Sequence, residues 1–141
     1  MSRIFWDTNI FIYLMEGSIE NSKLAQSLLR RMTERQDELM TSTMTLGEIM
    51  VKPIRDADQE TIKRYETLLS SPGVVVIDFD RRAAKIYSYL RLDRRIQAPD
   101  AIQLACAAAA ETDLFVTNDA RLSQKKVEGI DFIVPLAKVF L

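Results

Sequence analysis

The sequence contains no histidine and only one cysteine among its 141 residues. The absence of histidine excludes histidine-based nucleases, serine-histidine-aspartate hydrolases and the usual zinc hydrolases, because their bases or metal ligands are missing. The lone Cys106 excludes an intramolecular disulfide and a cysteine-based zinc site, and it favours a reducing cytoplasm. Any catalytic chemistry must therefore depend on other side chains.

Long apolar runs and an excess of positive charge are also missing. The longest nearly apolar segment, Ala101 to Ala110, is interrupted by Gln103 and is far shorter than the roughly 20 residues that span a bilayer. The N-terminus lacks the features of a signal peptide, so we expect a cytoplasmic protein that does not associate with membranes. The formal net charge is -1, which gives no global positive field, so any contact with RNA must be local.

Apolar, strand-like runs alternate with longer segments of helical periodicity, which predicts an α/β fold. We expect a single domain over residues 1–141, with a mostly parallel central sheet of four to five strands flanked by helices. The predicted strands are residues 4–6, 39–43, 74–77, 114–117 and 132–134. The β-branched run 74–77 should be buried on both faces, and a helix at 44–51 should stop before Pro53.

Four carboxylates stand where predicted helices begin, and several of these starts follow a predicted strand. They are Asp7, Glu48, Asp100 and Asp119. The carboxyl ends of parallel strands meet at one edge of a sheet, so these acids should converge there. Like charges would repel by roughly 4 kcal/mol per close pair at an effective dielectric near 20, so a cation should lie among them. Carboxylate oxygens favour Mg²⁺, with Mn²⁺ as the alternative.

Each acid taken alone can be explained as a helix cap, because helix N-termini attract anionic side chains. Thr45 and Glu48, for example, have the spacing of a capping box. Independent caps have no reason to converge, however. The combined pattern favours an acidic cluster that holds one or two metal ions and hydrolyses a phosphodiester.

Four motifs, in this order, resemble the PIN domain family, and specifically the VapC-type toxin ribonucleases of type II toxin-antitoxin systems. They are Asp7-Thr8-Asn9, Thr45-Leu46-Gly47-Glu48-Ile49, Pro99-Asp100-Ala101-Ile102-Gln103-Leu104-Ala105 and Val116-Thr117-Asn118-Asp119. The resemblance covers essentially the whole chain. A single motif such as Asp-Thr-Asn would be weak evidence, whereas the ordered set is fairly specific.

The resemblance implies a single PIN-like domain with a metal-dependent endoribonuclease site. Its catalytic acids would be Asp7, Glu48, Asp100 and Asp119. Asp7 and Asp100 would be the direct Mg²⁺ ligands, and the other two acids would hold a second ion or orient bound water. Thr117 and Asn9 are candidates for hydrogen bonds that orient the ligands. An RNA substrate, a cognate antitoxin and a homodimer are also implied.

The residues add hypotheses about partners and leave alternatives open. The apolar run Phe11 to Met15 is a candidate surface for the antitoxin, or it is buried in the monomer. Arg91, Arg94 and Arg95 could hold RNA phosphates, or they could be ordinary surface cations. The alternative functions are a receiver-like signalling domain with Asp78 as the phosphorylated acid, and a non-catalytic PIN-like binding module.

Overall fold

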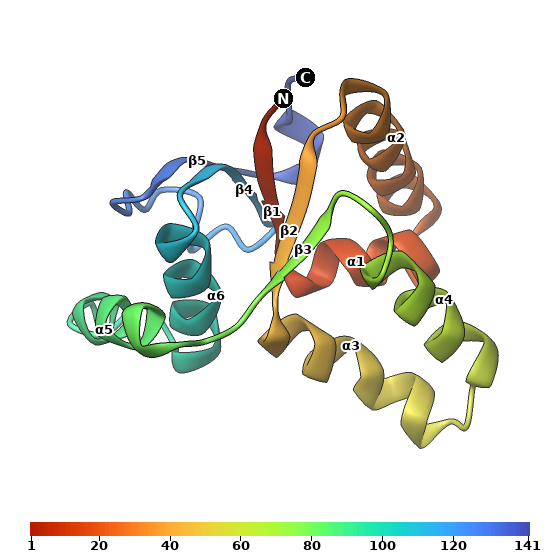
Figure 1. The fold of residues 1–141 in the computed structure, drawn as a ribbon, viewed down its shortest axis with the longest axis horizontal. Helices are drawn as coiled ribbons and strands as arrows, with labels where there is room; N and C mark the ends of the chain where they lie inside the picture. The colour runs from red at the N-terminus through yellow and green to blue at the C-terminus, as the bar shows by residue number, and fades with distance from the viewer.

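The computed structural model describes residues 1–141 and contains a five-stranded sheet in which all strand pairs are parallel. The strands are β1 (Arg3–Trp6), β2 (Glu38–Ser42), β3 (Val74–Ile77), β4 (Thr112–Val116) and β5 (Ile130–Val134). Their order is β3-β2-β1-β4-β5, which places β1 at the centre of the sheet (Figure 1). The predicted α/β class and parallel sheet are confirmed. The strand order differs from the 2-1-3-4-5 order of receiver folds.

Six α-helices and one short 3-10 helix connect or follow the strands. They are α1 (Thr8–Glu16), α2 (Ile19–Arg35), α3 (Thr43–Arg55), α4 (Gln59–Leu69), α5 (Arg81–Leu90), α6 (Ala98–Ala109) and η1 (Leu136–Lys138). None of them combines the length and the apolar character that crossing a bilayer requires.

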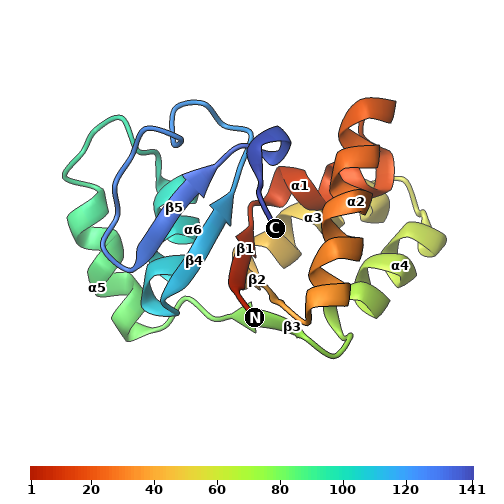
Figure 2. The same cartoon turned by 90° about the horizontal axis from the view of Figure 1, so that it is seen from above.

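Two apolar cores lie on opposite faces of the sheet, because successive side chains of a strand point to opposite faces. From β1, Ile4 and Trp6 pack with Phe11 of α1 and Leu28 of α2 in one core. Phe5 packs in the other core, with residues of α5 and α6. Figure 2 shows α5 and α6 on one side of the central strand and α1 to α4 on the other. The carboxyl end of β1 therefore lies between helices of both layers.

Three local predictions are wrong. The helix expected to stop before Pro53 continues to Arg55 as α3, because a proline in the last turn removes only one hydrogen bond and its ring is buried here. No helix begins at Asp119; its side chain accepts a hydrogen bond from the Arg121 amide and forms a turn instead. Strand β3 is at the edge of the sheet, so Val75 is 38% exposed rather than buried.

Candidate active site

Asp7 lies at the carboxyl end of the central strand and is the N-cap of α1. The residue is buried, with only 8% of its surface exposed. Its Oδ1 accepts a hydrogen bond from the Thr8 amide at 2.9 Å, and its Oδ2 accepts one from the Thr117 hydroxyl at 2.7 Å. Thr117 directly follows β4, which pairs with β1. Two neutral donors therefore fix the orientation of this carboxylate.

A buried amide, the side chain of Gln103 on α6, lies next to Asp7. Its Nε2 donates to Thr45 Oγ1 at 2.7 Å and to Thr8 Oγ1 at 3.1 Å, and it lies 3.5 Å from Asp7 Oδ1. Its Oε1 accepts a hydrogen bond from the Ser42 hydroxyl. Gln103 therefore joins α6 to the ends of β1 and β2 and to the start of α3.

Glu48 lies within α3 and not at its start, because the helix already begins at Thr43. The capping-box contact with Thr45, the alternative explanation for this acid, is not formed. Instead, Glu48 Oε1 accepts a hydrogen bond from the Thr8 hydroxyl at 2.6 Å. The oxygen of the Thr8 hydroxyl accepts a hydrogen bond from Gln103. Gln103 and Thr8 together therefore direct the Glu48 carboxylate toward the end of β1.

Asp100 and Asp119 form the more exposed half of the site, and Arg121 lies between them. Asp100 is in the first turn of α6, and Asp119 is in the turn after β4. The Arg121 guanidinium donates to both oxygens of Asp119, at 3.0 Å from Nε and 2.6 Å from Nη2. Its Nη2 also lies 3.5 Å from Asp100 Oδ2. One arginine thus pairs with two of the four predicted acids.

Three of the four acids have shifted pKa values, and neighbouring acids contribute to two of these shifts. Burial is the main cause of the raised pKa of Asp7, and the charges of Glu48 and Asp119 raise it further. Burial likewise raises the pKa of Asp100, followed by the charges of Asp7 and Asp119. The pKa of Asp119 is lowered instead, chiefly by its hydrogen bond from Arg121. The structure therefore brings all four predicted acids into mutual influence.

The chemistry of the donors fits an oxygen-preferring divalent ion, but no three acids of the chain form a ready ligand set. Asp7 is held by hydroxyl and amide donors, and Asp119 is held by Arg121. Burial, followed by the charges of neighbouring acids, raises the pKa of Asp7 and of Asp100, so a cation near these two residues would stabilise their charged forms. These two residues are the ones that could bind such an ion.

Sequence reasoning missed several residues that hold the acids in place. Gln103 belongs to one of the four motifs, but the sequence alone assigns it no role, although a lone amide in a buried, alanine-rich helix is itself a signal for a polar contact. Arg121 follows Asp119 by two residues, a spacing that suits an Asx turn. Asn9 is exposed and makes no side-chain hydrogen bond, whereas its neighbour Thr8 orients Glu48. Arg95 pairs with Asp93 at 3.0 Å and not with the four acids.

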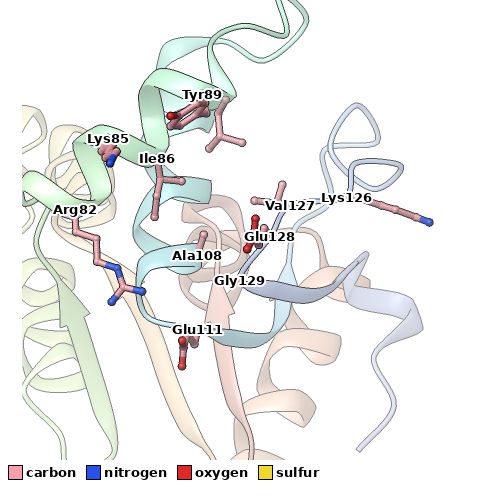
Figure 3. A pocket seen from close by; sticks show the side chains of 11 residues that line it. Arg82, Lys85, Ile86, Tyr89, Ala108, Glu111, Lys126, Val127, Glu128 and Gly129 are labelled. Atoms are coloured by element: carbon pink, nitrogen blue, oxygen red, sulfur yellow. The ribbon is translucent and has the colours of Figure 1, made fainter.

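A cavity of about 880 Å³ lies elsewhere, between α5, the end of α6 and the segment before β5 (Figure 3). Charged side chains of both signs, including Lys85, Lys126 and Glu128, surround apolar ones such as Ile86. None of the four acids lines it. We therefore place the candidate active site at the carboxyl edge of the sheet and not in this cavity.

The profile of the PIN domain family matches residues 4–128, a range that includes all four acids. The chain belongs to the PIN domain family. PIN domains are a family of nucleases and typically bind a divalent metal. The comparison with curated protein sequences gave no significant match.

Solved structures of toxin-antitoxin complexes resemble this PIN domain over nearly its whole length. The crystal structure of VapBC2 from Rickettsia felis, bound to a promoter DNA fragment, has a TM-score of 0.75 at 17% identity and covers 94% of this chain and 98% of its own. DNA-bound VapBC from Salmonella typhimurium has a TM-score of 0.74 at 21% identity, covering 96% and 99%. A toxin-antitoxin complex from Klebsiella pneumoniae has a TM-score of 0.67 at 25% identity, covering 90% and 94%.

Proposed function

We propose that this PIN domain is a metal-dependent endoribonuclease that acts as the toxin of a toxin-antitoxin pair. The observation that carries the proposal is the convergence of four carboxylates from distant parts of the chain, which hydrogen bonds link through Thr8, Thr117 and Arg121. The four carboxylates are Asp7, Glu48, Asp100 and Asp119. Membership of a nuclease family and the likeness to VapBC complexes support the same conclusion.

Asp7 and Asp100 are the proposed metal ligands, with Mg²⁺ or Mn²⁺ as the ion. The ion would supply positive charge for the phosphate and acidity for a bound water. The protein's part is to hold the acids in position: Thr117 fixes Asp7, and Thr8 fixes Glu48. Glu48 and the Asp119 carboxylate are then available to orient water or a second ion.

The proposed antitoxin would contact the surface formed by α1 and α4. A cleft of about 510 Å³ lies there, lined by Met15 of α1 and by α4 residues that include one acid, Glu60, two bases, Lys63 and Arg64, and the apolar Leu68. Apolar and basic side chains together suit an amphipathic, acidic peptide.

We also propose a homodimer, and a monomeric mass in sedimentation at micromolar concentration would count against it.

The test is cleavage of labelled total RNA by the purified chain in Mg²⁺ or Mn²⁺, in EDTA, and by Asp7→Asn. Asp78→Asn is the matched control, because Asp78 is an exposed acid that follows the edge strand β3. We expect cleavage that requires the metal, that is lost in Asp7→Asn and that is retained in Asp78→Asn. RNA binding without cleavage by the wild type would instead support a non-catalytic binding module.

A further inference from the structure

Arg121 is the basic side chain that forms ion pairs with the acidic site. It contacts Asp119 at 2.6 Å and Asp100 at 3.5 Å, and no other lysine or arginine forms an ion pair with any of the four acids. The protein therefore supplies a positive charge of its own to Asp100 and Asp119, in addition to the divalent ion that the sequence predicts. A divalent ion bound at Asp100 would be repelled by this guanidinium, because Arg121 Nη2 lies 3.5 Å from Asp100 Oδ2.

The ion pairs of Arg121 with Asp119 and Asp100 are exposed, so other charged groups can replace either partner. Its side chain is 55% exposed, and it lies on the turn between β4 and β5 and not in the core. Ion pairs with this exposure are weak and strongly screened by water. Nε and Nη2 contact Asp119, whereas Nη1 has no hydrogen-bond partner. A long, exposed side chain of this kind can leave Asp119 and remain at the rim of the site.

We propose that Arg121 binds a phosphate of the RNA substrate, and that it holds Asp100 and Asp119 until a divalent ion displaces it. This inference rests on the proposed function. A guanidinium fork matches the geometry of a phosphate as well as that of a carboxylate, so both partners can use the same donors. The metal and Arg121 compete for the carboxylates of Asp100 and Asp119, whereas the metal does not compete with the RNA phosphate.

The first measurement is calorimetric titration of Mn²⁺ into the wild-type chain, Arg121→Gln and the control Arg30→Gln. Arg30 is exposed on α2 and forms no ion pair, so the control removes the same charge away from the site. We expect Arg121→Gln to bind Mn²⁺ at least about threefold more tightly, because a competing positive charge is gone. Arg30→Gln should bind Mn²⁺ with wild-type affinity.

The second measurement is binding of a fluorescein-labelled, nuclease-resistant 2′-O-methyl phosphorothioate oligonucleotide in saturating Mn²⁺, followed by anisotropy. Arg121→Gln should bind it about tenfold more weakly, the scale of a lost charged contact to phosphate. Arg121→Lys keeps the charge but not the fork, so we expect nearly wild-type Mn²⁺ affinity and intermediate affinity for the oligonucleotide. Tighter metal binding together with weaker oligonucleotide binding is the signature of the proposal.

Two results would overturn the proposed role of Arg121. Weaker binding of both Mn²⁺ and the oligonucleotide by Arg121→Gln would mean that Arg121 only positions Asp119. Unchanged Mn²⁺ affinity would show that Arg121 and the metal do not compete. If neither the wild type nor Arg121→Gln binds Mn²⁺, both this inference and the proposed function fail. If Arg121→Gln binds Mn²⁺ more tightly and the oligonucleotide more weakly while the wild type cuts no RNA, the nuclease function fails and the proposed role of Arg121 is retained. Thermal unfolding of each variant identifies any that does not fold.

Discussion

The two halves of the acidic site are held in different ways. Asp7 is buried and is oriented by the neutral hydroxyl of Thr117 and the amide of Thr8. Asp119 lies on a surface turn and is paired with the exposed, charged side chain of Arg121. The first half is built together with the core of the fold, whereas the second depends on an ion pair that can exchange without disturbing that core.

The pKa values of the two aspartates move in opposite directions for this reason. Burial disfavours the charged form of Asp7, so its pKa is raised, while the hydrogen bond from Arg121 favours the charged form of Asp119 and lowers its pKa. Because the two pKa shifts are opposite, we expect that removing the charge of Asp7 favours folding and that removing the charge of Asp119 does not. Four substitutions test this difference.

Asp7→Asn should have the largest effect, a loss of RNA cleavage of at least about 100-fold. Substituting residues that merely orient metal ligands typically costs 10- to 100-fold, and the loss of Asp7, a proposed ligand, should cost no less. The same variant should be more stable than the wild type in EDTA at pH 7, as measured by urea unfolding. Activity and stability would then change in opposite directions at this one position.

The sign of the stability change follows from the raised pKa of Asp7. A group with a raised folded-state pKa favours folding below its unfolded pKa, near 4, and that contribution is lost as the pH rises through the folded value. At pH 7 the ionised Asp7 therefore destabilises the fold, and asparagine removes this cost. The advantage of Asp7→Asn should disappear below about pH 4. If Asp7→Asn were less stable than the wild type at pH 7, ionised Asp7 would not destabilise the fold.

Gln103→Leu tests whether the buried half depends on its amide. The substitution leaves the hydroxyls of Ser42, Thr45 and Thr8 without their buried partner, so we expect a loss of about 2–4 kcal/mol in the free energy of unfolding. Gln26→Leu on the exposed face of α2 is the control and should change stability by about 0.5 kcal/mol or less. Equal stability of the two variants would show that the network is dispensable.

The strands and the four acids could be predicted because their signals are local. A β-branched or aromatic run between turn residues predicts a strand, and parallel strands bring their carboxyl ends to one edge. Asp7 and Asp100 lie near helix starts, as the sequence predicts. The sheet class and the electrostatic convergence of the acids follow from these patterns alone.

The contacts that orient the acids could not be predicted, because they join residues far apart in the chain. Gln103 meets Thr45 and Thr8 only after α6 packs against the ends of β1 and β2. The burial of β3 depends on its position at the sheet edge, and a sequence pattern does not give the strand order. The missing helix after Asp119 reflects competition between local side-chain hydrogen bonds and helix formation.

Thr117→Val should have an intermediate effect. It removes the hydroxyl that donates to Asp7 at 2.7 Å and accepts from the Asp119 amide at 3.1 Å, while it keeps the shape of the side chain. We expect a loss of about 1–3 kcal/mol, measured by urea unfolding at pH 7, because a buried acceptor is left unpaired. Thr117→Ser retains the hydroxyl and is the control. If valine is tolerated as well as serine, the hydroxyl does not hold Asp7.

Asp119→Asn should have the smallest effect on stability, about 0.5 kcal/mol or less, because its ion pair with Arg121 is exposed. The lowered pKa of Asp119 means that its contribution is fully present above the unfolded pKa, near 4, and is lost as the pH falls through the lowered folded-state pKa, so any destabilisation should be smaller at pH 3 than at pH 7. Urea unfolding at pH 7 and pH 3 measures both points. Because the two aspartates have opposite pKa shifts, Asp7→Asn and Asp119→Asn should change stability with opposite signs at pH 7. A shared sign would mean that the two halves are held by the same forces.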